Sequence, residues 1–189
     1  MSTDGAEHDA SPTGDTASFL ADGKAVGRWV LDPAHSKVEF HEKHFWGLIT
    51  VHGSFAEVSG EGEVGGDGSI SGRISFGASS LGTRNNRRDT HLRSADFFDA
   101  ARHPEVVLTV TSAKLGDAAT LACEGILEAA GHREPVSFGA RLGEASERAV
   151  TLRAELAVDR SRFGMTWSPL HVSSREPRGV VVARFVRAD

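Results

Sequence analysis

The chain has 189 residues, 39% of them hydrophobic and 25% charged, which is ordinary for a soluble globular protein with one sizeable core. Its formal net charge is −5. Five acidic residues against one lysine in positions 1–25 carry −4 of that charge. The remainder is too neutral for the basic surface that nucleic-acid binding normally needs, so we expect no nucleic-acid partner.

Residues 1–26 are predicted to be a disordered acidic tail, because small and polar residues are mixed there with Asp and Glu. Residues 27–189 are predicted to form one domain. The tail lacks the apolar run of about 7 to 15 residues that marks a secretory signal, and the chain has no stretch of about 18 apolar residues that could span a membrane. A lone cysteine, Cys123, cannot form an intramolecular disulfide. We therefore expect a cytoplasmic protein without a membrane span.

Alternating apolar and polar residues predict strands through most of the chain. In residues 36–44, Val38 and Phe40 share one face, whereas Lys37, Glu39 and His41 take the other. One further strand is expected over residues 47–58. The clearest strand covers residues 150–160, where the apolar face consists of Val150, Leu152, Ala154, Leu156 and Val158.

About eight such segments favour an all-β fold, either an up-and-down antiparallel barrel or a sandwich. A last strand at residues 179–187 can pair with the first at 28–31 and remove both sheet edges. Glycines crowd residues 60–82, as at bulges and barrel corners. Because the inward faces mix Ala, Gly, Val and Cys with few large residues, we expect a cavity.

One helical insert, around residues 84–100, interrupts this pattern. Leu92, Phe97 and Phe98 within it are expected to cover an open end of the barrel. In a second interpretation, Arg88, Asp89 and His91 cap and tie down a short helix. Both interpretations can hold together.

Several motifs occur in a specific order and together identify a resemblance. They are Asp32-Pro33-Ala34-His35-Ser36, Val51-His52-Gly53-Ser54-Phe55, Arg88-Asp89-Thr90-His91-Leu92-Arg93-Ser94, and Asp159-Arg160-Ser161-Arg162-Phe163-Gly164. This order resembles the YceI-like family. The resemblance implies an extended lipocalin-like barrel whose interior holds a long-chain lipid, such as an isoprenoid, an isoprenoid quinone or a fatty-acid derivative. It also makes a homodimer plausible. The chain departs from the family pattern in its acidic tail, its lack of tyrosine and its polar loop at residues 168–179.

The predicted function is therefore binding, sequestration or transport of such a lipid, without catalysis, cofactor or metal. Arg88, His91 and His35 are the predicted donors to a polar head group, because guanidinium and imidazole groups bind phosphate or carbonyl oxygens. The other predicted lining residues are large and apolar. They are Phe40, Trp46, Phe76, Leu92, Phe97, Phe98, Leu108, Phe138, Leu152, Leu156, Phe163 and Trp167.

The alternative is a small-molecule enzyme or a metal-binding protein that uses His35, Arg88 and His91. Histidines at positions 35, 41, 44, 52 and 91 raise the possibility of metal ligation. However, His41 and His44 lie three apart on one predicted strand, so their side chains point to opposite faces.

Overall fold

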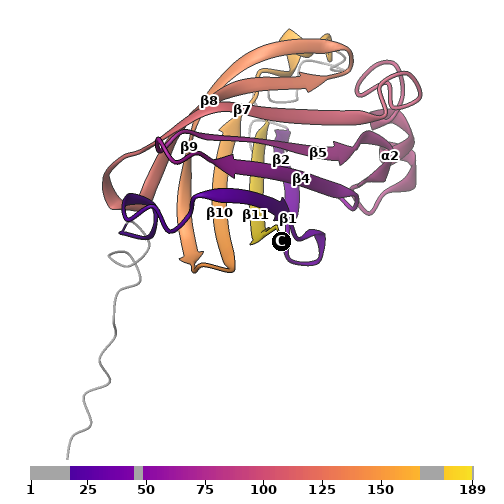
Figure 1. Cartoon of the computed structure of the whole chain (residues 1–189). Helices are drawn as coiled ribbons and strands as arrows, with labels where there is room; N and C mark the ends of the chain where they lie inside the picture. The colour runs from indigo at the N-terminus through magenta and orange to yellow at the C-terminus, as the bar shows by residue number, and fades with distance from the viewer. Residues whose placement is uncertain (1–17, 45–48, 167–176, 189) are drawn as a thin grey trace, which may run out of the picture.

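The computed structural model describes residues 18–44, 49–166 and 177–188, which form an antiparallel β-structure with few short helices (Figure 1). In chain order, the elements are β1 (Gly27–Leu31), η1 (Pro33–His35), β2 (Lys37–His44), β3 (Ile49–Phe55), β4 (Val58–Val64), β5 (Ile70–Gly77), η3 (Ala78–Ser80), β6 (Leu81–Gly82), α2 (Asn86–Leu92), β7 (Glu105–Leu115), η4 (Asp117–Ala119), β8 (Thr120–Ala129), β9 (His132–Ala145), β10 (Ala149–Ala157), η5 (Arg160–Phe163) and β11 (Arg178–Arg187).

Eight of these strands close into a barrel, in the order β1-β4-β5-β7-β8-β9-β10-β11 and back to β1. The closing pair places Trp29 opposite Arg187 and Leu31 opposite Phe185. This confirms the predicted all-β barrel and the predicted pairing of the last strand with the first. Closure leaves neither β1 nor β11 as a free edge.

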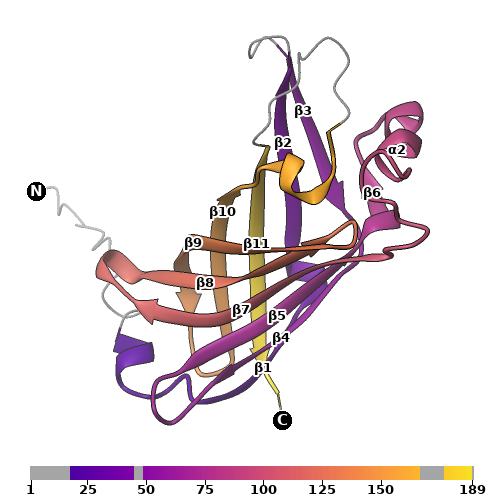
Figure 2. The ribbon, with the colours of Figure 1, turned by 90° about the horizontal axis from the view of Figure 1, so that it is seen from above.

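The remaining strands extend the sheet beyond the ring. β11 is long enough to pair with β1 near its end and with β2 near its start, where Val182 faces Lys37. β2 then pairs with β3, and β3 pairs with β6. In Figure 2 the β2–β3 hairpin projects from the barrel, with β6 and α2 beside it. β1 and β2 are thus two halves of one broken strand on β11.

The break at residues 32–36 is held by hydrogen bonds to β11 and within the turn. The Asp32 N–H donates to the Arg184 carbonyl (2.8 Å), and the Ser36 hydroxyl accepts from the Arg184 N–H (3.0 Å). The Asp32 carboxylate accepts from His35 Nδ1 (2.7 Å) and from the Ala34 N–H (3.1 Å). The His35 hydrogen bond is the largest cause that lowers the pKa of Asp32.

The strand expected over residues 47–58 is interrupted. β3 ends at Phe55 and β4 begins at Val58, because the Ala56 and Glu57 N–H groups donate to the Ser80 carbonyl (3.3 Å) and hydroxyl (3.1 Å). These bonds turn the chain from pairing with β2 to pairing with β1. Two strands therefore occupy a region for which the alternation predicted one, and residues 47 and 48 lie outside the described part.

The helical insert is confirmed as the short helix α2, followed by turns up to Pro104. Asn85 caps α2 by accepting from the Arg88 N–H (3.1 Å). The buried Asp89 carboxylate accepts from the Thr83 N–H (2.8 Å) and hydroxyl (2.5 Å), and Arg88 Nε donates to the Thr83 hydroxyl (2.7 Å). These bonds tie the helix to the end of β6, as the second interpretation of the insert expected.

The packed region reaches back into the segment predicted as tail. Phe19 is 5% exposed and packs edge-on against Trp29, with ring centres 6.4 Å apart. Ala25 is also buried, and its carbonyl accepts from Trp29 Nε1 (2.8 Å). Residues 18–26 thus pack on the barrel, while residues 1–17 lie outside the described part of the chain.

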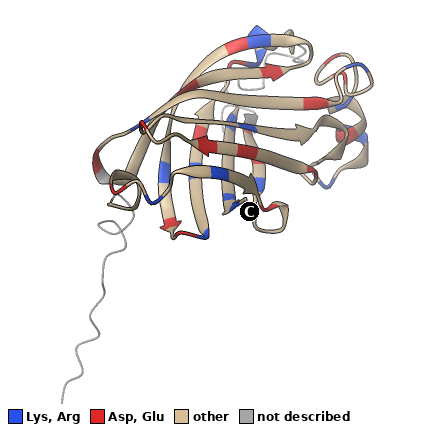
Figure 3. Ribbon diagram, in the orientation of Figure 1, with Lys and Arg blue, Asp and Glu red and all other residues tan. Residues whose placement is uncertain are grey.

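Charged residues of both signs are interspersed on the barrel ribbon (Figure 3). The buried residues form an apolar cluster that includes side chains from most of the strands. Within the described ranges, no helix is both long and apolar enough to cross a bilayer.

Candidate functional site: an apolar lumen

Two cavities lie inside the barrel. The first has a volume of about 130 Å³ and is lined mainly by apolar side chains of β1, β4, β5, β7, β8, β9, β10 and β11 together with the segment before β1. Its apolar lining includes Leu20, Ala25, Trp29, Ile74, Leu108, Val110, Ala113, Leu121, Cys123, Phe138, Ala140, Leu142, Val150, Leu152, Ala154, Val181, Ala183 and Phe185. Small residues such as Ala140 and Ala154 leave space where longer side chains would fill it.

The second cavity, of about 140 Å³, lies toward β2, β3 and the insert. Its apolar lining includes Val38, Phe40, Phe55, Phe76, Leu92, Phe97, Phe98, Val106, Leu108, Leu127, Ala129, Leu156, Val158, Phe163, Met165 and Val181. Apolar lining of this kind accepts apolar ligands.

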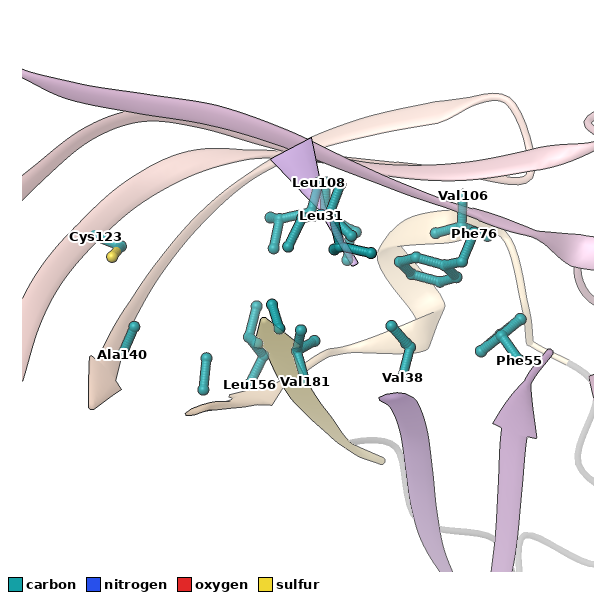
Figure 4. Close-up of a cluster of buried hydrophobic side chains, with 14 of the residues drawn as sticks. Leu31, Val38, Phe55, Phe76, Val106, Leu108, Cys123, Ala140, Leu156 and Val181 are labelled. Carbon is teal, nitrogen blue, oxygen red and sulfur yellow. The ribbon is translucent and has the colours of Figure 1, made fainter. Parts of the chain in front are cut away.

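Leu108 and Val181 line both cavities. Figure 4 shows Leu108 and Leu31 on one side of the cluster and Leu156 and Val181 on the other, with space between the two pairs. Cys123 and Ala140 lie on one side of this constriction, and Phe55 and Phe76 lie on the other. The two cavities therefore lie next to each other in the barrel and share part of their lining, and we call them together the waisted lumen.

Residues from outside the eight-stranded ring also line each half of the lumen. Leu20 and Ala25 contribute to the wall of the first cavity. In the second, Phe98 from the insert packs edge-on against Phe55, with ring centres 5.8 Å apart, and Phe97 is 9% exposed. The insert thus supplies apolar lining to the lumen.

A buried ion pair lines the second cavity. Glu42 of β2 and Arg160 of η5 are 9% and 8% exposed, and Arg160 Nε lies 3.7 Å from Glu42 Oε1. The Arg160 guanidinium also lies over the Phe97 ring, 5.9 Å from its centre. This pair places hydrogen-bonding groups in an otherwise apolar wall.

Sequence reasoning did not select Glu42 or Arg160. A signal was present, because Glu42 falls on the same alternating face as Val38 and Phe40 and so points inward with them. Arg160 lies in the motif at residues 159–164, which contributes to the family resemblance but does not by itself indicate a lining residue. A charged side chain that faces the interior requires an oppositely charged or hydrogen-bonding partner. The sequence does not identify that partner.

The structure brings ten of the predicted lining residues to the waisted lumen. Leu108, Phe138 and Leu152 line the first cavity. Phe40, Phe76, Leu92, Phe97, Phe98, Leu108, Leu156 and Phe163 line the second. Trp46 and Trp167 lie outside the described residues.

The three predicted head-group donors are not among the lining residues of either cavity. His35 lies on the exposed turn before β2 and pairs with Asp32. Arg88 lines a separate groove on the outer surface, and His91 Nε2 lies 3.1 Å from an Asp96 carboxylate oxygen. Alternation could not reveal this arrangement, because Arg88 and His91 lie in the helical insert and His35 lies in the turn before β2.

Cys123 is the free thiol in the first cavity. Burial raises the pKa of this thiol, because the apolar surroundings disfavour the thiolate. It is therefore a poor nucleophile at neutral pH and behaves as a small apolar residue.

The fold and its lumen define a class: closed antiparallel β-barrels with an apolar interior. A family model described as the YceI-like domain matches residues 29–187, and the chain belongs to this family. A UPF0312 protein of Staphylococcus aureus (strain USA300) is 33% identical over 86 residues, which cover 44% of this chain and 50% of the relative. The match thus spans about half the length of the curated relative.

Solved structures share the fold at low sequence identity. BcnA of Burkholderia cenocepacia superposes with a TM-score of 0.73 at 16% identity, over 82% of this chain and 98% of BcnA. A polyisoprenoid-binding domain of Saccharophagus degradans gives a TM-score of 0.70 at 14% identity, over 85% and 98%. A YceI protein of Campylobacter jejuni gives 0.67 at 20% identity, over 75% and 88%. These likenesses support the barrel architecture.

Proposed function

We propose that the chain binds a long-chain apolar lipid in the waisted lumen and sequesters or carries it without catalysing a reaction. The observation that carries this proposal is the pair of apolar cavities that meet at Leu108 and Val181 inside a closed barrel. The name of the Saccharophagus degradans neighbour, a polyisoprenoid-binding domain, supports an isoprenoid as the ligand class. An isoprenoid quinone and a fatty-acid derivative are the other candidates.

Chain length is expected to set the affinity. At roughly 0.3 kcal/mol per heavy atom, a chain of about 20 carbons gains about 6 kcal/mol and one of about 40 gains about 12. These energies correspond to dissociation constants of roughly tens of micromolar and low nanomolar. A long chain reaches the higher value only if it passes the constriction at Leu108 and Val181, fills both cavities and extends beyond them, because volumes of about 130 and 140 Å³ hold only part of it.

The polar end of the lipid is expected to lie at the Glu42–Arg160 pair. The Arg160 guanidinium is a hydrogen-bond donor group in the lining of the second cavity, and Glu42 offsets its positive charge at 3.7 Å. A neutral head with acceptor oxygens, such as a quinone, fits this pair better than a doubly charged phosphate, which the Glu42 carboxylate repels. Arg88, His91 and His35 remain a second set of candidate donors.

Titration of the delipidated chain tests the proposal. Isoprenoids of increasing length should bind at one site with increasing affinity, and a quinone should bind more tightly than a hydrocarbon of equal length. Arg160→Gln should remove the preference for the quinone. The matched control is Arg162→Gln, in the same turn, because that exposed side chain pairs with Glu134. Equal affinity for short and long chains would contradict the proposal.

The enzyme or metal alternative built on His35, Arg88 and His91 has no supporting geometry. These side chains are engaged with three different partners, which are Asp32, Thr83 and Asp96. Cytoplasmic localisation and a homodimer belong to the proposal as well. Cell fractionation and the solution mass of the purified chain test them.

A further inference from the structure

A polar groove of about 540 Å³ lies on the outer surface of the β2–β3 hairpin, next to β6 and the start of α2. Successive side chains of a strand point to opposite faces. Val38 and Phe40 line the second cavity, and the alternate residues Glu39 and His41 line this outer groove. The two histidines of this groove have no part in the proposed lipid function, and of the candidate head-group donors Arg88 lines the groove.

Two histidines face each other across the hairpin in this groove. His41 of β2 and His52 of β3 are directly opposite in the strand register. Their ring centres are 4.5 Å apart, with ring planes at 69°. Directly opposite residues on antiparallel strands keep their side chains close whatever the neighbouring loops do, so the backbone itself holds the two imidazoles together.

This spacing matches that of two imidazoles sharing one metal ion. With metal–nitrogen distances of about 2.0–2.1 Å and an angle of roughly 90–110° at the metal, the ring centres lie roughly 4.5–5 Å apart. Imidazole nitrogens suit Cu²⁺, Ni²⁺ and Zn²⁺, and affinity generally rises from Ni²⁺ to Cu²⁺ and falls again at Zn²⁺. The ring-centre separation of the observed pair therefore falls within the range expected for chelation of such an ion.

The other residues that line the groove include charged side chains of both signs. Glu39 lies two residues before His41 on the same face and adds a carboxylate to the groove. Arg84 and Arg88 also line it, but the Arg88 guanidinium is directed to Thr83, donating to its hydroxyl (2.7 Å) and carbonyl (3.1 Å). In the part of the chain that the structure describes, no three His, Cys, Asp or Glu side chains form a metal-holding group. The protein thus offers two ligands, and water must complete the coordination.

We infer that His41 and His52 chelate a divalent transition-metal ion, of the Cu²⁺, Ni²⁺ or Zn²⁺ class, on the outer face of the β2–β3 hairpin. This site is independent of lipid binding, since the two imidazoles lie on the opposite face of the strands from the lumen.

The test is calorimetric titration of the untagged full chain, stripped with EDTA, with Ni²⁺ and then with Zn²⁺. The wild type should show a one-to-one site that either His41→Gln or His52→Gln weakens by about 10-fold or more, since even second-shell losses cost 10–100-fold. His132→Gln is the control, because His132 is exposed and does not line the groove. Melting temperatures measured in EDTA establish that each variant folds.

Two results would overturn the inference. One is metal binding that neither groove substitution changes, which would place the ion at other histidines. The other is an absence of metal binding in the wild type. Binding of inorganic phosphate that Arg84→Gln abolishes, with no metal binding, would assign the groove to anions instead.

Discussion

At the residue scale, the lumen wall contains a charge pair whose members depend on each other. Glu42 and Arg160 are both buried and 3.7 Å apart. A buried charge that loses its partner keeps its desolvation cost without the compensating attraction. Glu42 and Arg160 are therefore expected to be coupled strongly in the free energy of unfolding.

Arg160→Leu should lower the free energy of unfolding by about 3–5 kcal/mol, the usual cost of removing one partner of a buried ion pair. The double variant Glu42→Leu/Arg160→Leu should recover much of that loss. Arg162→Leu, at an exposed pair, should cost about 1 kcal/mol or less. Urea denaturation measures all three, and additive costs for Glu42→Leu and Arg160→Leu would contradict the coupling.

The turn between β1 and β2 predicts a pH dependence. The pKa of Asp32 is lowered, mainly by the His35 hydrogen bond, so the ionised carboxylate is favoured in the folded state. Its contribution is present above the unfolded-state pKa of about 3.9 and is lost as the pH falls through the lower folded-state pKa. Asp32→Asn should therefore be less stable than the wild type at pH 7, and the difference should shrink between about pH 4 and pH 2. A difference independent of pH would show that the charge is irrelevant.

At the element scale, the strands were largely predictable, because successive side chains of a strand alternate between its two faces. The apolar face of residues 150–158 follows directly from the alternation, and Val150, Ala154 and Leu156 are indeed buried. Pairing of the last strand with the first followed from the need to remove edges.

The breaks in the strands could not be predicted in the same way. β3 ends because Ser80, far along the chain, supplies the acceptors for Ala56 and Glu57. The partner of Glu42 likewise comes from a turn distant in sequence. Alternation reports which face a residue occupies, but it carries no information on which distant group meets it.

The backbones of β7 and β8 approach each other closely at Gly125. The register shifts between Val110 and Ser112, and a Cβ at Gly125 would lie 2.2 Å from the Thr109 carbonyl oxygen. Gly125→Ala should therefore cost about 1–3 kcal/mol through overpacking. Gly139→Ala, on the adjacent β9, is the control, since its nearest contact would be an ordinary 3.5 Å to a Thr120 methyl group. Thermal unfolding of both variants measures the difference, and equal stability would refute the close approach.

At the scale of the whole molecule, the constriction at Leu108 and Val181 is expected to determine how far a bound lipid extends through the barrel. Leu108 and Val181 contribute to both halves of the lumen, so a bulkier residue there separates them. Leu108→Trp should leave the affinity for a chain of about 10–15 carbons within a few-fold of the wild type. It should weaken a chain of about 40 carbons by 100-fold or more, because half of that chain no longer fits. Competition binding with the two chain lengths measures this, and an equal loss for both lengths would contradict the single waisted lumen.

The proposed function depends on a cavity that the sequence indicated only through small inward-facing residues. Large side chains at Ala140 or Ala154 would have predicted a filled barrel of the same topology. The fold could therefore be predicted from the alternation of apolar and polar residues, whereas the volume of the interior space could be seen only in the structure.

Native mass spectrometry of the purified chain, with organic extraction of the released material, tests the central claim most directly. The proposal predicts one copurifying long-chain lipid per chain or per homodimer, with a mass that identifies the ligand class. A chain that purifies empty and takes up no isoprenoid of any length would contradict lipid binding.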